Sequence, residues 1–230
     1  MGSSIMKEYL SQNAPVAASL EQHMAAYRVD LPLRMEMDAI ARVLSSLDLG
    51  AYTCLDAGFD NPVSSQAFRK LGGFWSSVVW SAAQREQATA LLEEDVFQVG
   101  AHNELPYEDK QFDVVVLGRG RLSGNRVADE FLVQECHRVL KTPGYLVICC
   151  NYRKPAGLAA LFGRRFRLAQ GAYNESQMFE LLKTGFDVLS VKTFCRFWVY
   201  LTRRLFERPD HNPVLINLVF RIAYQLDLLL

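Results

Sequence analysis

Two nearly unbroken apolar runs, at residues 114–117 and 145–150, dominate the hydrophobic pattern of the chain. Parallel strands that are covered on both faces have continuous hydrophobic sequences, so these runs predict two buried strands. Between them, Phe131, Leu132 and Val139 keep helical spacing and predict a connecting helix. We expect the Thr142-Pro143-Gly144 sequence to end this helix, because proline and glycine commonly follow helix termini.

The remainder of the chain continues the alternation of strands and helices. Strands are predicted at residues 52–55, 74–80, 96–99 and 186–194, and helices at 15–30, 33–48, 63–71, 82–94 and 174–184. This order is typical of an α/β protein with a doubly wound, mostly parallel sheet. We expect an α/β domain at residues 49–195, a helical segment at 1–48, and an apolar and basic helical tail at 196–230 packed on the domain or on a partner.

The segment at residues 104–152 combines a polar turn, LPYEDKQFDVVV, with the later sequence RVLKTPGYLV. This order of features resembles the centre of class I S-adenosylmethionine-dependent methyltransferases of the type 11-like group. The resemblance covers roughly residues 50–195. It implies a Rossmann-like methyltransferase fold, S-adenosylmethionine as cofactor, and methyl transfer as the activity.

The resemblance also implies where the cofactor is held. In open α/β sheets, ligands bind at the carboxyl ends of the strands. After the first strand, Asp56, Ala57 and Gly58 match the acid and the first glycine of the family pattern, and Asp60 lies in the following turn. Glycine at such a turn lets a ligand approach the backbone closely.

The remaining positions of the implied cofactor site depart from the family pattern. Where the family has an acid for the ribose hydroxyls, this chain has Val79 and Trp80, which cannot accept two hydroxyl hydrogen bonds. Near the expected adenine position the chain carries Ala101, His102 and Asn103, and a basic loop begins at Gly118 after the fourth strand. No residue is assigned a catalytic role.

These residues leave two functional hypotheses open. In the first, the protein is a methyltransferase acting on a small-molecule, lipid or glycan-precursor substrate. Loss of the ribose acceptor then costs about 1–3 kcal/mol, which still permits binding at high cofactor concentration. In the alternative, the protein is a catalytically inactive methyltransferase-fold protein that serves as an interaction or scaffolding module. If Phe59, Pro62 or Trp80 fills the adenosine volume, the alternative is favoured; an open cleft favours the enzyme.

The charge distribution bears on binding partners. The formal net charge is zero, yet residues 141–208 carry twelve Lys and Arg residues against four acids. Such asymmetry indicates either a solvated basic face or an anionic partner. The cluster at residues 164–167 lacks an aromatic binding face, which argues against nucleic acid. The helix that starts at Pro213 has a broad apolar side, so we expect the parent domain, a second copy in a homodimer, or a membrane surface to cover it.

Several other classes of protein lack support in the sequence. No run of about twenty apolar residues predicts a spanning helix. The four histidines are scattered without a ligand set, so we expect no metal site. Neither a GxSxG elbow nor a GxxxxGK loop is present, which argues against hydrolases and nucleoside triphosphatases.

Cysteine usage and the chain ends predict the compartment. The five cysteines form no CxxC pair and read as reduced, buried thiols. Residues 1–4 read as a cloning remnant without a following signal sequence. We therefore expect a cytoplasmic protein, or one peripheral to the inner membrane face. The family's final antiparallel strand is not evident before Leu230, so we expect a truncated chain or a six-stranded sheet.

Overall fold

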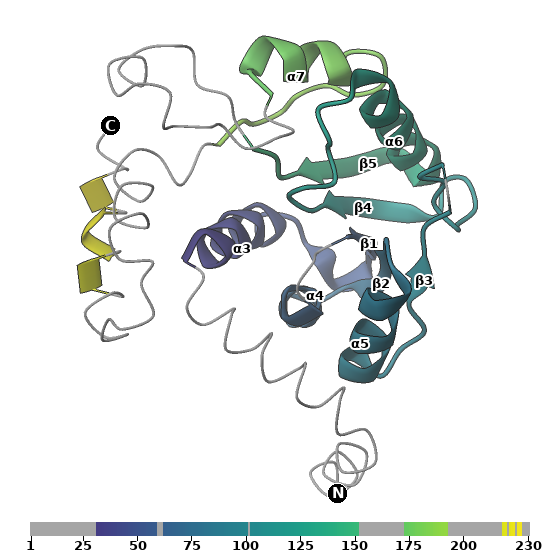
Figure 1. Cartoon of the computed structure of the whole chain (residues 1–230), viewed down its shortest axis with the longest axis horizontal. Coiled ribbons are helices and arrows are strands. Elements are labelled where there is room, and N and C mark those ends of the chain that lie inside the picture. The colour runs from purple at the N-terminus through teal and green to yellow at the C-terminus, as the bar shows by residue number, and fades with distance from the viewer. Residues whose placement is uncertain are drawn as a thin grey trace, which may run out of the picture. The chain divides into compact units, whose positions relative to one another are not determined.

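The computed structural model describes residues 31–58, 62–100, 102–151 and 173–192, together with residues 218–219, 221–223 and 225–226 of a C-terminal helix (Figure 1). The chain divides into two compact units. The central unit runs from Leu47 to Val191, and the other is formed from the two flanking parts of the chain. All residues of the implied cofactor site belong to the central unit.

The central unit is built on a five-stranded sheet of order β3-β2-β1-β4-β5, in which every pair is parallel. The strands are β1 (Thr53–Ala57), β2 (Phe74–Val79), β3 (Phe97–Gln98), β4 (Phe112–Leu117) and β5 (Leu140–Ile148). Val114, Val115, Val116 and Leu117 of β4 have no exposed surface. The 114–117 run therefore forms a buried parallel strand, and the predicted α/β fold is confirmed. The prediction of a second buried strand at 145–150 is wrong: Tyr145 is 36% exposed and only Cys149 of this run is buried, because β5 stands at the end of the described strand order.

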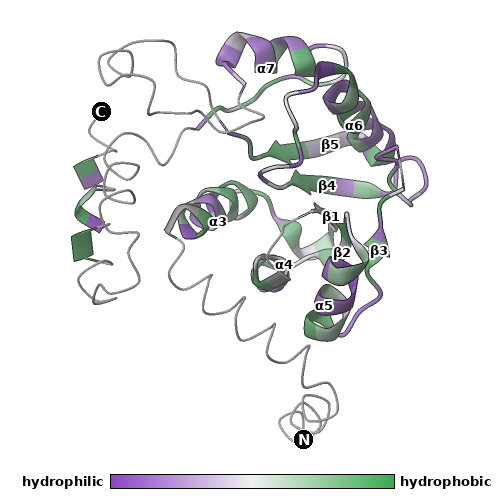
Figure 2. Ribbon diagram, viewed as in Figure 1, coloured by the Kyte–Doolittle hydropathy of each residue, from purple (hydrophilic) through white to green (hydrophobic). Residues whose placement is uncertain are grey.

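Helices cover both faces of this sheet (Figure 1). The helices α4 (Pro62–Arg69) and α5 (Ala82–Leu92) lie on one face, and α6 (Arg126–Val139) and α7 (Glu175–Leu182) on the other. The larger core lies on the α6 side, where β1 and β4 residues pack with Leu132, Val133 and Cys136. Figure 2 shows hydrophobic residues toward the carboxyl ends of β4 and β5 and hydrophilic stretches on the helices.

Within the described residues, two helical elements precede the sheet. The helix α3 (Leu31–Leu44) belongs to the flanking unit and buries Met35, Ile40 and Leu44 along one side. A short 3-10 turn, η1 (Leu49–Ala51), follows and leads into β1. The predicted helix at 33–48 is thus shorter at its end, because Ser45 and Ser46 bond back to main-chain carbonyls in a turn.

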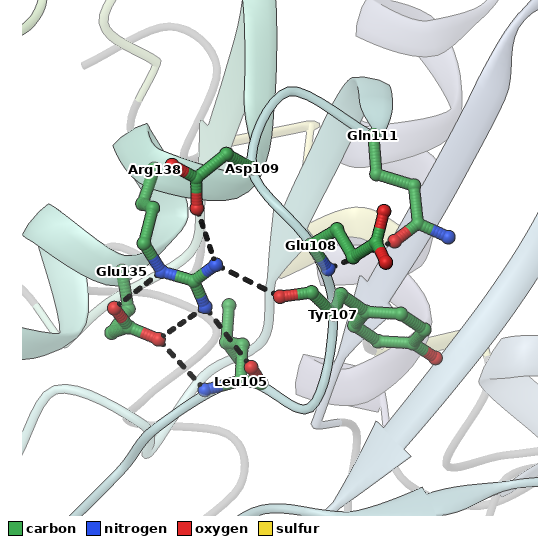
Figure 3. A network of polar contacts seen from close by, with 7 residues as sticks. All are labelled: Leu105, Tyr107, Glu108, Asp109, Gln111, Glu135 and Arg138. Atoms are coloured by element: carbon green, nitrogen blue, oxygen red, sulfur yellow. Dashed lines mark hydrogen bonds and ion pairs between the residues drawn. The ribbon is translucent and has the colours of Figure 1, made fainter.

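The turn that carries the family resemblance is held to α6 by Arg138 (Figure 3). The Arg138 guanidinium donates to the carbonyl oxygens of Leu105 at 3.1 Å and Tyr107 at 2.8 Å. It also pairs with Glu135 at 2.8 Å through two nitrogens, while Glu135 accepts the Leu105 N–H at 2.9 Å. These motif residues therefore fix the 105–107 loop against α6.

A second group of motif residues ties together the starts of β1, β4 and β5. Asp113 accepts hydrogen bonds from the Thr53 N–H, the Thr53 hydroxyl and the Lys141 ammonium, each at 2.8 Å. Partial burial opposes ionisation, but the bonds from Lys141 and Thr53 hold the pKa of Asp113 below its usual value. These motif residues therefore stabilise the sheet at the amino-terminal ends of its strands. The implied cofactor site lies at the opposite, carboxyl ends.

Two predictions about secondary structure are wrong. Thr142-Pro143-Gly144 does not end α6: Leu140 is already extended and pairs with Phe112, so the three residues lie inside β5 where its register with β4 shifts. The predicted strand at 186–194 is absent over residues 186–192, where Leu189 is 81% and Val191 60% exposed. An alternating apolar and polar sequence does not form a strand unless a neighbouring strand pairs with it.

The other predicted elements either differ from the observed ones only at their ends or lie outside the described residues. The predicted helix at 15–30 lies outside the described residues, as do residues 193–194. The described C-terminal residues from 218 onward are helical, and Leu218, Ile222 and Leu226 at four-residue spacing are exposed. What covers this apolar stripe stays a prediction.

Candidate functional site

The implied cofactor site begins at Gly58, directly after β1. Gly58 has a φ of 83°, in the left-handed region that favours glycine. A Cβ atom at this position would lie 2.2 Å from Trp80 Cζ3 and 2.7 Å from Arg121 Cδ. Glycine is therefore required here so that the Trp80 ring can lie against the backbone of the first turn.

Trp80 follows β2 and is held in place by two side chains from other loops. Its indole N–H donates to Asn103 Oδ1 at 3.0 Å. The guanidinium carbon of Arg121 lies 4.8 Å from the centre of the indole ring, which is a cation–π contact worth about 0.5–2 kcal/mol. Trp80, which follows β2, is thus contacted by the loops after β1 and β4 and by the turn at 102–103.

The loop that carries Arg121 is anchored by Asp129, a buried carboxylate in the first turn of α6. Asp129 accepts the main-chain N–H groups of Ser123 and Gly124, each at 2.8 Å, and the Ser123 hydroxyl at 2.9 Å. The Tyr173 hydroxyl also donates to it. Burial, and then the bond to Asp129, raise the pKa of Tyr173, so its hydroxyl keeps its proton. Arg121 is therefore presented by a firmly held loop.

Asp56, the acid of the first turn, is occupied by partners within the sheet and beneath α4. It is 1% exposed, and its Oδ2 accepts the Ser77 hydroxyl at 3.2 Å. Ser77 in turn accepts from Arg69 at 3.2 Å, and Arg69 pairs with Glu94 at 2.7 Å. This chain of polar contacts links β1 and β2 to α4 and the end of α5.

The position after Trp80 also serves a structural purpose. The Ser81 hydroxyl caps the N-terminus of α5 by accepting the Gln84 N–H at 3.3 Å. The Trp80 N–H donates to the Gln84 side chain at 3.3 Å. The end of β2 therefore carries a helix cap, and no carboxylate stands there to receive ribose hydroxyls.

The structure brings together only part of the predicted site. Gly58, Trp80 and Asn103 meet, and Gly118 lies buried at the end of β4, where its N–H donates to the Ala57 carbonyl at 3.2 Å. Val79 instead packs beneath α5 with Ala88 and Val96. His102 is exposed. Asp60 and Ala101, like Phe59, lie outside the described residues, and the side chain of Pro62 is also not described.

Arg121 is the central residue that sequence reasoning did not single out. The sequence showed only a basic loop, Gly118-Arg119-Gly120-Arg121, and nothing in its spacing pointed to Trp80. The Trp80 ring and the Arg121 side chain fill the space where a Cβ of residue 58 would lie. In the described part of the chain, no group of three or more His, Cys, Asp or Glu side chains is placed to hold a metal ion.

Residues 55–148 match the sequence model of the methyltransferase domain family. This span contains β2 to β5, all of β1 except its first two residues, and the loops around Trp80. The α/β domain has the class I methyltransferase fold. No curated protein matches the chain in sequence.

Solved structures, some of them named as methyltransferases, share this fold. A protein from Pyrococcus horikoshii OT3 is similar with a TM-score of 0.56 and 18% identity over 72% of this chain and 88% of that one. An S-adenosylmethionine-dependent methyltransferase from Mesorhizobium loti is similar with a TM-score of 0.53 and 14% identity over 74% and 91%. The [4+2]-cyclase SpnF is similar with a TM-score of 0.54 and 22% identity over 66% and 58%. At these identities the likeness establishes the fold alone.

Among the helical residues that are described, none forms a helix both long and apolar enough to cross a membrane.

Proposed function

We propose that this methyltransferase-fold protein does not hold S-adenosylmethionine at its strand ends and acts as a non-catalytic interaction module. The observation that carries the proposal is the Trp80 ring, whose Cζ3 atom lies 2.2 Å from where a Cβ of Gly58 would be. The close approach that the glycine permits is used by a side chain of the protein itself, in the place where a ligand would otherwise contact the first turn.

The contacts of Trp80 support the same conclusion. Asn103 accepts the indole N–H, and Arg121 lies over the ring, so the closed position is stabilised from two sides. Moving the ring would break a hydrogen bond worth about 0.5–1.5 kcal/mol in addition to the cation–π contact. A ligand would have to supply this free energy before it gained any contact of its own.

The other polar residues of the candidate site supply few hydrogen-bond partners for a nucleoside. Asp56 is buried and bonded to Ser77, and Ser81 caps α5. A nucleoside in this position would lack the paired hydroxyl acceptor that anchors ribose. Fold alone does not imply an activity, and one structural relative is named as a cyclase.

Isothermal titration calorimetry with S-adenosylhomocysteine tests the proposal. We expect no saturable heat for the wild-type protein at ligand concentrations of about 1 mM, which corresponds to a binding free energy weaker than about −4 kcal/mol. The variant Trp80→Asp opens the space above Gly58 and supplies a carboxylate, so we expect it to bind more tightly than wild type. Asn103→Ala, which removes only the anchor of the ring, is the matched control, and circular dichroism checks that each variant is folded.

Saturable one-to-one binding by the wild-type protein would contradict the proposal. It would favour the other hypothesis, methyl transfer to a small-molecule, lipid or glycan-precursor substrate. The next measurement would then be transfer of a labelled methyl group to extracted metabolites and lipids.

A further inference from the structure

The edge of the sheet formed by β2 and β3 exposes two aromatic side chains, one at the first residue of each strand. Phe74, the first residue of β2, is 68% exposed, and Phe97, the first residue of β3, is 45% exposed. In the described part of the chain β3 pairs only with β2, which makes it an edge strand. Large apolar side chains on an edge strand indicate a binding surface or a liability to aggregation.

A shallow groove of about 740 Å³ lies beside Phe97. Its apolar wall includes Phe97, Pro106 and Tyr107, and its polar lining consists of Ser76, Glu108 and Gln111. The lining contains one carboxylate and no basic side chain. Residues 102–111, which lead into β4, form turns and contain no helix. A loop therefore borders the groove.

The wall of this groove is held rigidly. The Tyr107 ring packs edge-on against Phe97 at 5.7 Å and against Phe112 at 4.8 Å between ring centres. Arg138 bonds the Tyr107 carbonyl, and the Glu108 N–H donates to the Gln111 side chain at 3.2 Å (Figure 3). A preformed wall lowers the entropy cost of binding a partner.

We infer that this groove binds a basic segment of a partner protein, with an arginine or lysine side chain between the exposed Phe97 ring and the Glu108 carboxylate. An aromatic ring attracts a cation over its face, and a carboxylate beside it supplies the opposite charge. Among the exposed charged residues within two positions of the lining in the chain, three are acidic (Asp95, Glu104 and Asp109) and one is basic (Lys110), so acids outnumber the base. The inference gives the proposed interaction role a partner chemistry.

Fluorescence polarisation with a fluorescein-labelled dodecapeptide of alternating arginine and leucine tests this inference. Matched peptides carry citrulline or glutamate in place of arginine. We expect the arginine peptide to bind at least about tenfold more tightly than the citrulline peptide, with affinity that falls as salt rises. Phe97→Ser and Glu108→Gln should each weaken it by about threefold to tenfold, the range of a partly exposed cation–π contact or ion pair.

Two control variants remove comparable groups elsewhere. Val127→Ser changes a 77% exposed apolar residue on α6, and Glu86→Gln changes an exposed acid on α5; both should leave peptide affinity unchanged. Equal binding of the arginine and citrulline peptides, or undiminished binding by both groove variants, would overturn the inference. Because the peptide assay does not involve S-adenosylhomocysteine, its failure is distinguishable from failure of the proposed function.

Discussion

Replacing Arg138 with methionine tests whether the family motif acts as a structural clamp. The substitution keeps most of the apolar side-chain volume and removes the donors to the Leu105 and Tyr107 carbonyls. It also leaves the Glu135 carboxylate, only 12% exposed, without its cation. Two lost charge-assisted bonds and a poorly solvated carboxylate together predict a loss of about 2–4 kcal/mol in the free energy of unfolding.

Urea unfolding followed by tryptophan fluorescence and far-ultraviolet circular dichroism measures this loss. The matched control is Asp109→Ala, because Asp109 is 72% exposed in its pair with Arg138; we expect it to cost about 0–0.5 kcal/mol. Changing Glu135 to methionine as well removes the uncompensated charge, so the double variant should recover about 1 kcal/mol relative to Arg138→Met alone.

The reasoning would be refuted by either of two results. A loss below about 0.5 kcal/mol for Arg138→Met would mean that the loop does not depend on the guanidinium. An equal loss for Asp109→Ala would mean that the exposed ion pair, and not the bonds to the main chain, carries the effect.

Three further predictions follow from buried or paired groups. Bonds from Arg138 hold the pKa of Glu135 in the folded protein below its usual 4.5. The ionised Glu135 therefore stabilises the fold fully above pH 4.5, and this stabilisation is lost as the pH falls through the lower pKa of the folded state. Urea midpoints measured from pH 6 to 3 should fall more steeply for wild type than for Glu135→Gln. Asp129→Ala leaves the Ser123 and Gly124 N–H groups and the Tyr173 hydroxyl without their acceptor, and it should cost about 2–4 kcal/mol in urea unfolding, whereas a cost near zero would show that water replaces the carboxylate. Burial raises the pKa of Cys54 and of Cys136 to about 12, so neither thiol should react with Ellman's reagent at pH 8 until urea unfolds the protein, and rapid native labelling of either, located by mass spectrometry, would contradict the buried placement.

The hydrophobic pattern determined the fold because each of its signals is local. Strands buried on both faces need continuous apolar runs, and residues 114–117 have one, so β4 could be identified before any neighbour was known. The same reasoning found the helix start at Asn174, whose side chain caps α7 in the structure. It failed at residues 186–192, where strand formation depends on a partner that the sequence cannot specify.

The sequence placed Gly58 and Trp80 among the candidate site residues, but it could not show that the Trp80 ring lies against the Gly58 backbone. Whether the glycine admits a ligand or a side chain depends on which ring lies above it, and that is settled by the register of β1 against β2 and by the loop that Asp129 anchors. The contact between Arg121 and Trp80 joins residues from two loops that no sequence period connects. Local propensities and burial patterns can be read from the chain itself, whereas the contacts of Trp80 with Gly58 and Arg121 result from long-range packing that only the tertiary structure decides.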